Sequence, residues 1–278
     1  TILFEKHLKF STAQPNWPDR DRFILSAGHG SMLLYSVAYL CGYADFDIDQ
    51  LKNFRQLGKK TAGHPENFLS DVIETTTGPL GQGIANSVGF AIAEESLRAR
   101  FGRNIIDHHT FVIAGDGCLM EGVSQEAISL AGHLRLHKLI VFWDNNNITI
   151  DGTVDLTDST DQKTRFEASG WEVIEIDGHD PEEIDSAISA AKKSEKPTMI
   201  ACKTHIAIGT AAQDTSKGHG ALTDPELIKN AREVYQWSHK PFDIPKSIKE
   251  QWEQAGLEGH KAFKRWQSKL ENLSNSIK

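Results

Sequence analysis

Two stretches decide the fold: Thr110-Phe111-Val112-Ile113-Ala114-Gly115-Asp116-Gly117 and Leu139-Ile140-Val141-Phe142-Trp143-Asp144-Asn145-Asn146. Each is a short apolar run, typical of a buried strand, that ends in side chains carrying oxygen. A helical pattern over residues 124–135 separates them, so together they predict one strand–helix–strand unit. Because ligands bind at the carboxyl ends of parallel strands, we expect Asp116 and Asn146 to lie in a binding site.

The same alternation extends to both sides of this unit. It predicts further strands at 171–176 and 198–202, and helices at 31–40, 47–54, 81–100, 161–168 and 181–192. Such alternation is typical of an α/β fold, with a parallel sheet and helices on both of its faces. Residues 1–24 show no regular pattern, and we expect them to be irregular.

The sequence changes character after about residue 222. Asp224-Pro225 is a typical helix start, residues 239–245 break the pattern, and residues 246–272 are highly charged with a helical repeat of aromatic side chains. We therefore expect two parts: an α/β domain at 1–222 and a helical connector at 223–278.

Composition excludes several classes of function. The chain has 278 residues and a net charge of −8, which argues against a nucleic-acid partner. No stretch approaches 18 apolar residues and the first residues do not form a signal peptide, so we expect no membrane partner. Three isolated cysteines without a C-x-x-C pair are typical of a reducing compartment, and we expect a cytoplasmic protein.

The two strand-end side chains predict a metal site. A carboxylate and an amide oxygen suit Mg²⁺ or Ca²⁺, especially when phosphate oxygens and water fill the remaining positions. The Gly-Asp-Gly sequence around Asp116 alone also occurs in ordinary surface turns. Its combination with Asn146, 30 residues later, makes the metal interpretation the stronger one.

A glycine-rich segment, Gly78-Pro79-Leu80-Gly81-Gln82-Gly83, precedes the longest predicted helix of this domain. Glycines at such a place allow backbone N–H groups to approach a phosphate or a flat ring. An ordinary glycine-rich helix start is the alternative. The segment is not a P-loop, because no Gly-Lys-Ser/Thr follows it.

Three histidines lie in loops rich in glycine or proline: His29, His64 and His219. Near-neutral pKa values suit histidines to proton transfer and to binding of sugar hydroxyls or diphosphate oxygens. A zinc site is the competing interpretation, although the three are far apart in sequence and no cysteine joins them. We expect the other histidines, including His108-His109 and His179, to be structural or solvated, and Glu121 to supply charge at a helix start or to lie at a dimer interface.

Together these segments resemble transketolase over nearly the whole chain. The matching stretches include Asp19–Phe23, Gly28–Leu33, Lys52–Leu57, Gly63–Glu66, Glu74–Asn86, Gly115–Gly122 and Asp144–Gly152. The resemblance implies the thiamine-diphosphate-binding fold. It also implies that Asp116, Asn146 and the carbonyl of Ile148 bind Mg²⁺ or Ca²⁺, which bridges the cofactor's diphosphate.

The remaining site residues follow from the same resemblance. Gly117 and His29 would contact the diphosphate, Gly78 and Leu80 would line the thiamine rings, and His64 and His219 would meet the substrate. We thus expect His29, His64 and His219 to be catalytic. The implied reaction, part of the pentose phosphate pathway, transfers a two-carbon ketol unit from a ketose phosphate to an aldose phosphate.

The resemblance also implies a partner. In the family the glutamate that activates the cofactor lies in a pyrimidine-binding domain that follows this one, as do the arginines that bind substrate phosphate. We therefore expect this chain to be inactive alone and to need that domain or a C-terminal subunit, in a homodimer or heterotetramer. Alanines at 27 and 62, and Lys217-Gly218, depart from the usual family pattern and leave the local loop geometry open.

Two alternatives remain open. The chain could be a non-catalytic fragment that binds thiamine diphosphate or only dimerises. It could also serve a related enzyme, such as deoxyxylulose-phosphate synthase or dihydroxyacetone synthase.

Overall fold

A computed structural model describes residues 1–220 and 223–277 of the chain. Five parallel strands form one sheet in the order β1-β2-β3-β5-β4. Their bounds are β1 Arg22–Leu25, β2 Thr110–Gly115, β3 Leu139–Asn145, β4 Glu172–Asp177 and β5 Thr198–Lys203. The prediction of a parallel α/β sheet is confirmed.

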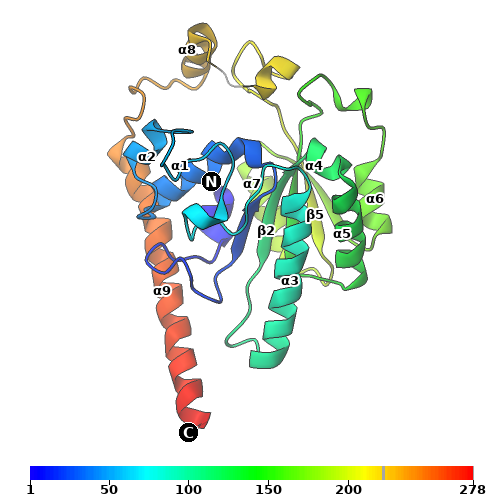
Figure 1. The fold of residues 1–278 in the computed structure, drawn as a ribbon, viewed down its shortest axis with the longest axis vertical. Helices are drawn as coiled ribbons and strands as arrows, with labels where there is room; N and C mark the ends of the chain where they lie inside the picture. The colour runs from blue at the N-terminus through cyan, green and yellow to red at the C-terminus, as the bar shows by residue number, and fades with distance from the viewer. Residues whose placement is uncertain (221–222, 278) are drawn as a thin grey trace.

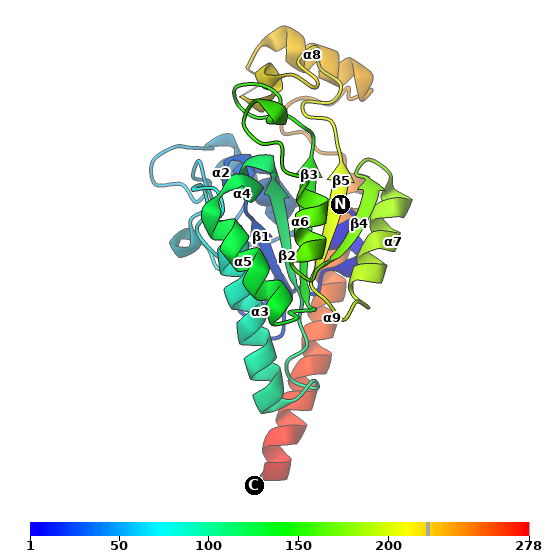
Figure 2. The ribbon, with the colours of Figure 1, turned by 90° about the vertical axis from the view of Figure 1, so that its right-hand side faces the viewer.

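Helices cover both faces of the sheet (Figures 1 and 2). One apolar core lies between the sheet and α3, α5 and α6, and a second lies between the sheet and α1 and α7. The helix bounds in this part are α1 Ser31–Cys41, α2 Ile48–Lys52, α3 Gln82–Phe101, α4 Asp116–Met120, α5 Gly122–His133, α6 Gln162–Ala168 and α7 Pro181–Ala191.

The apolar runs explain this layering because successive side chains of a strand point to opposite faces. Val112 and Val141 lie in the core beneath α3 and α5, while their neighbours Phe111 and Ile140 lie in the other core. All four are fully buried. Strands buried on both faces need apolar residues at every position, which the sequence shows in β2 and β3.

The prediction that residues 1–24 are irregular is wrong. Arg22–Leu25 form β1, which pairs with β2 in parallel, and Leu3–His7 form one π-helical turn. Four residues are too few to show a strand period, so only pairing with Thr110–Ile113 makes this segment a strand. The short helix α4, which starts at Asp116 directly after β2, was also not predicted.

The part after residue 222 consists of α8 Pro225–Val234 and α9 Lys246–Ile277. α9 packs along α1 and the N-terminal segment, and the indole Nε1 of Trp266 donates to the carbonyl of Ile105 at 2.8 Å. Among the described helices none is long and apolar enough to cross a membrane. Residue 222, the predicted end of the first domain, lies outside the described residues, and the division there stays a prediction.

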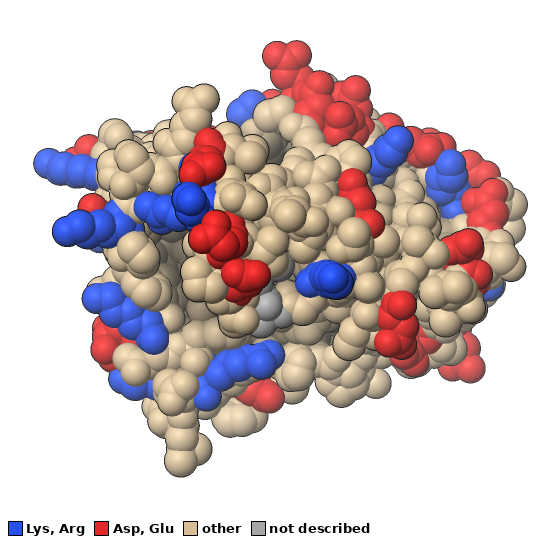
Figure 3. Space-filling view, turned by 90° about the horizontal axis from the view of Figure 1, so that it is seen from above, with Lys and Arg blue, Asp and Glu red and all other residues tan. Residues whose placement is uncertain are grey.

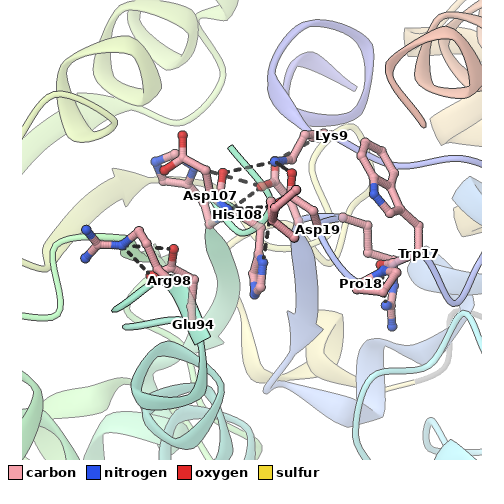
Figure 4. Close-up of polar contacts among 12 residues, drawn as sticks. Lys9, Trp17, Pro18, Asp19, Glu94, Arg98, Asp107 and His108 are labelled. Carbon is pink, nitrogen blue, oxygen red and sulfur yellow. Dashed lines mark hydrogen bonds and ion pairs between the residues drawn. The ribbon is translucent and has the colours of Figure 1, made fainter. Parts of the chain in front are cut away.

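A network of charged side chains, some of them buried, lies at the amino edge of the sheet, where β2 and β3 begin (Figure 4). The carboxylate of Asp19 accepts from Lys9 Nζ at 2.8 Å and from the backbone N–H of Asp107 at 2.5 Å. Lys138, just before β3, pairs with Glu94 of α3 at 3.0 Å and also with Asp107. These contacts join the N-terminal segment, α3 and the sheet.

Candidate functional site

The candidate site lies at the opposite, carboxyl edge of the sheet. Asp116 is the first residue of α4 and follows β2, and Asn146 follows β3. Asp116 is 8% exposed, and its Oδ1 accepts a hydrogen bond from Trp143 Nε1 at 2.9 Å. Its Oδ2 is buried, and none of the described residues donates a hydrogen bond to it.

This environment is unfavourable for a bare carboxylate. Burial raises the pKa of Asp116 to about 6, and the negative charges of Asp144 and Asp158 act in the same direction. The indole of Trp143 and the backbone N–H of Asn147 oppose the rise without cancelling it. A buried carboxylate oxygen without a partner is costly, and a bound cation would supply the missing interaction.

The turn after β3 carries the two other oxygens that are expected to bind the metal. Asn146 Oδ1 accepts from the backbone N–H of Ile148 at 2.9 Å, and Asn147 has a positive φ of 62° that reverses the chain. Within the described part of the chain, no three His, Cys, Asp or Glu side chains are grouped to hold a metal. One carboxylate, one amide and one carbonyl fit Mg²⁺ or Ca²⁺ with ligand phosphates, and they do not fit a protein-only zinc site.

The glycine-rich segment packs beside Asp116. A Cβ on Gly117 would lie 2.8 Å from Leu80 Cδ1, and a Cβ on Gly78 would lie 2.8 Å from His64 Cγ. Gly78 has a φ of +138°, a conformation that other residues rarely adopt. Four of the six residues expected to meet diphosphate, thiamine and substrate, namely Gly78, Leu80, Gly117 and His64, therefore lie close together in a cradle where an added Cβ would clash.

The three predicted histidines also gather here, although they are far apart in sequence. The rings of His29 and His219 stack with centroids 5.1 Å apart. The pKa of His29 is lowered mainly by burial, and the nearby His219 and His64 lower it further. His219 Nδ1 is buried, and no hydrogen-bond partner for it exists among residues 1–220 and 223–277. A neutral His29 ring can donate one hydrogen bond and accept another.

Sequence reasoning missed the residues that hold these loops. Tyr35 OH donates to the carbonyl of His64 at 3.2 Å, and Ser31 Oγ donates to the carbonyl of Gly63 at 2.9 Å. Asp144 accepts from Asn146 Nδ2 at 3.1 Å and from the hydroxyl of Thr204. Asp144 and Thr204 stand at the carboxyl ends of β3 and β5, and this position was the available signal.

Of the other polar residues named in the sequence analysis, His109 and His179 lie away from the candidate site, and Glu121 lies at its border. Burial lowers the pKa of His109 to about 4 at the amino edge. His179 accepts from the backbone N–H of His205 at 3.0 Å beyond the ends of β4 and β5. Glu121 is the N-cap residue of α5, and its Cβ would be 2.8 Å from a Cβ on Gly81. Glu121 therefore borders the cradle.

The face above the carboxyl edge is not uniformly acidic despite the net charge of −8 (Figure 3). Lysine and arginine side chains gather toward the left of this view, and acidic side chains gather toward the top and right. Acidic side chains and a basic one also lie near the middle of this view. An anionic ligand therefore meets no continuous negative surface on this side.

Comparison with known proteins gives a consistent result. The family model "Transketolase, thiamine diphosphate binding domain" matches residues 1–277. A transketolase of Rhodobacter capsulatus is 56% identical over 274 residues, which are 98% of this chain and 41% of that protein. A transketolase of Cereibacter sphaeroides is 53% identical over 272 residues, with the same coverage of 98% and 41%.

Solved structures agree in fold. Transketolase from Leishmania mexicana superposes with a TM-score of 0.96 at 42% identity, covering 99% of this chain and 42% of that one. Transketolase from Campylobacter jejuni gives a TM-score of 0.93 at 45% identity, covering 97% and 43%. The chain thus spans about two fifths of the length of the relatives it matches. It belongs to the transketolase family, by its match to the thiamine diphosphate binding domain.

Proposed function

We propose that this chain is the diphosphate- and metal-binding part of a transketolase. The enzyme would transfer a two-carbon ketol unit from a ketose phosphate to an aldose phosphate. The observation that carries the proposal is the buried Oδ2 of Asp116, which has no hydrogen-bond partner among the described residues and lies next to the glycine cradle. Burying an unpaired carboxylate costs free energy, and a bound cation would offset that cost.

Each residue has a role in this proposal. Asp116, Asn146 and the carbonyl of Ile148 hold Mg²⁺ or Ca²⁺, which neutralises diphosphate charge. Gly117 and His29 contact the diphosphate, and Gly78 and Leu80 form the wall against the thiamine rings. The bound thiamine diphosphate supplies the chemistry that breaks and remakes the carbon–carbon bond.

The histidines act on the substrate. His64 and His219 bind hydroxyl oxygens of the sugar, and His219 exchanges a proton with the ketose oxygen. The low pKa of His29 keeps its ring neutral at pH 7, so that it can donate one hydrogen bond and accept another. His29 and His219 are stacked, and His219 is one of the causes that lower the pKa of His29.

Catalysis also requires a pyrimidine-binding domain, either in the same polypeptide or in a separate subunit. We propose a homodimer or heterotetramer in the cytoplasm that acts on sugar phosphates of the pentose phosphate pathway. Three free cysteines, Cys41, Cys118 and Cys202, support a reducing compartment.

The test replaces the matching segment of the Rhodobacter capsulatus transketolase with this chain. We expect the chimera to transfer ketol units and to need both thiamine diphosphate and Mg²⁺ or Ca²⁺. A folded chimera without activity at saturating cofactor would refute the proposal. Use of pyruvate in place of the ketose phosphate donor would instead favour deoxyxylulose-phosphate synthase, and use of formaldehyde in place of the aldose phosphate acceptor would favour dihydroxyacetone synthase.

A further inference from the structure

We infer that His205 and Asp214 are positioning residues that close the loop between β5 and the 3₁₀ turn Ser216–His219 and thereby hold His219 in place for the reaction. This inference rests on the proposed function and deepens it, because it names residues that act through His219. The loop leaves β5 after Lys203 and ends at the candidate site. A series of contacts along it joins the ends of β4 and β5 to the His219 ring.

The two ends of the loop are joined by a side-chain pair. His205 Nδ1 lies 2.9 Å from Asp214 Oδ2 and 3.0 Å from Asp214 Oδ1. An ionised carboxylate can only accept hydrogen bonds, so Nδ1 carries the proton in this contact. The backbone N–H of Asp214 also donates to the carbonyl of Ile206 at 3.2 Å. A side-chain contact and a backbone hydrogen bond thus close the loop at one place.

The closed loop is attached to the edge of the sheet. The backbone N–H of His205 donates to His179 Nε2 at 3.0 Å, and the two histidine rings stack with centroids 5.7 Å apart. His179 follows β4, and its own backbone N–H donates to Asp177 Oδ1 at 2.8 Å. The His205–Asp214 pair is therefore connected to the ends of two strands.

The inner side of the loop packs against the residue before His219. A Cβ on Gly218 would lie 2.8 Å from Ala207 Cβ and 2.8 Å from the carbonyl oxygen of Ala212. The backbone of Gly218 is thus in close contact with two parts of the loop. Its neighbour His219 stacks on the ring of His29. A loop that opens would therefore displace Gly218, and the His219 ring with it.

The backbone of this loop depends on contacts of this kind. Ala207 and Asp214 have positive φ angles of 50° and 54°, a conformation that is unfavourable for residues with a Cβ, although aspartate tolerates it better than alanine. A second support comes from Tyr235, whose hydroxyl donates to the carbonyl of Ile208 at 2.9 Å. Strained residues keep their conformation only while the surrounding structure holds them.

The His205–Asp214 pair is suited to placing the loop and not to stabilising the domain. Both side chains are 44% exposed, and an exposed ion pair contributes little to the free energy of unfolding. Loss of the pair should therefore leave the domain folded and the loop displaced. The expected consequence is slower turnover with unchanged cofactor binding.

The test measures ketol transfer by the chimera at saturating cofactor. Asp214→Ala removes the acceptor and His205→Leu removes the donor, so each breaks the pair from one side, and either one suffices if the other does not fold. We expect kcat to fall about tenfold, because a misplaced proton donor or acceptor loses part of its contribution. The half-saturating concentration of thiamine diphosphate should stay within about twofold.

A conservative variant and a matched control accompany these two. His205→Asn keeps a side-chain N–H close to the place of Nδ1 and should recover most of the lost kcat. His137→Leu breaks another histidine–carboxylate pair, with Glu95 at 3.4 Å, just before β3 at the amino edge. This control should leave kcat unchanged.

A double-mutant cycle with His219→Ala shows whether the pair acts through His219. If it does, adding Asp214→Ala or His205→Leu to His219→Ala should lower kcat by less than about twofold further. A general loosening of the domain would lower kcat by the same factor with and without His219.

The outcomes are distinct. Unchanged kcat in a folded Asp214→Ala or His205→Leu variant, equal losses with and without His219, or no recovery in His205→Asn would overturn the role of the pair and leave the proposed function standing. A folded chimera with the wild-type sequence that transfers no ketol units would overturn the proposed function itself, and this inference with it.

Discussion

Asp116 and Asp19 lie at opposite edges of the same sheet and are equally buried, at 8% and 6% exposure. At the amino edge, Asp19 accepts from Lys9 and from the backbone of Asp107. At the carboxyl edge, Asp116 Oδ1 accepts from Trp143, and Oδ2 has no hydrogen-bond partner among the described residues. Burial alone therefore does not distinguish them, whereas the supply of partners does.

The pKa values of the two carboxyls follow this difference. Burial opposes ionisation of Asp19, but His108, Lys9 and the backbone N–H of Asp107 lower its pKa below the ordinary value. Burial raises the pKa of Asp116 to about 6, and the indole of Trp143 and the backbone N–H of Asn147 do not compensate. The comparison teaches that a buried carboxyl with several hydrogen-bond and charge partners keeps a low pKa, whereas one with few partners has a raised pKa, which is typical of functional sites.

The largest expected effect tests the role of Asp116 directly. Asp116→Ala removes the carboxylate that would hold the metal, and we expect loss of measurable metal-dependent thiamine diphosphate binding by calorimetry. Asp151→Ala removes an exposed acid from the loop after β3 and should bind as the wild type does. Unchanged affinity in Asp116→Ala would show that the metal is not held here.

His219→Ala should separate binding from turnover in the chimera. A positioned proton donor or acceptor contributes about 10²–10⁴-fold to rate, so we expect kcat to fall by roughly that factor. Cofactor affinity should stay within about twofold, an allowance for an indirect effect through the stacked His29 ring. His133→Ala, at an exposed position of α5, is the matched control. A large loss of cofactor affinity would contradict the role of His219 toward the substrate and would indicate that it binds the cofactor.

The amino edge should respond in the opposite way. Lys138→Met leaves the buried Glu94 with Arg98 as its remaining cationic partner, and we expect the free energy of unfolding to fall by about 3 kcal/mol in urea titrations. Thiamine diphosphate affinity should not change. Lys163→Met breaks an exposed ion pair with Glu175 and should cost less than about 1 kcal/mol. Similar losses of unfolding free energy in both variants would mean that the amino-edge network contributes no more to stability than an exposed ion pair does.

The smallest expected effect is a gain in stability that depends on pH. The folded pKa of Asp116 lies above its unfolded value, so ionisation destabilises the metal-free fold above pH 6, and this cost disappears as pH falls below about 4. Asp116→Asn should therefore be more stable than the wild type by about 1–2 kcal/mol at pH 7.5 without metal. The advantage should vanish near pH 4. Denaturant titrations at both pH values measure it, and a constant difference would contradict the raised pKa.

Local sequence patterns were sufficient for most of the fold. The predicted strand at 139–144 appears as Leu139–Asn145, and the predicted helix at 81–100 appears as Gln82–Phe101. Both have enough residues to show their period and clear start or stop signals. β1 has four residues and no such signals, so it could not be found before its pairing with β2 was known.

The features of the candidate site also fall into those that the sequence could predict and those that it could not. Asp116 and Asn146 could be proposed because strand ends are recognisable in sequence and parallel strands bring those ends to one edge. The hydrogen bonds of Trp143 to Asp116 and of Thr204 to Asp144 could not, because each joins residues 27 and 60 positions apart through side-chain geometry.

The sequence by itself determined the parallel α/β architecture, the strand-end oxygens and the glycine-flanked histidines, since these depend on residue type and local period. Only the tertiary structure decided that His29 stacks on His219, that Gly78 lies against His64, and that one buried aspartate is paired while another is not. The physical reason is that burial and partners belong to pairs of distant residues. Their energies arise only when the sheet has brought those residues together.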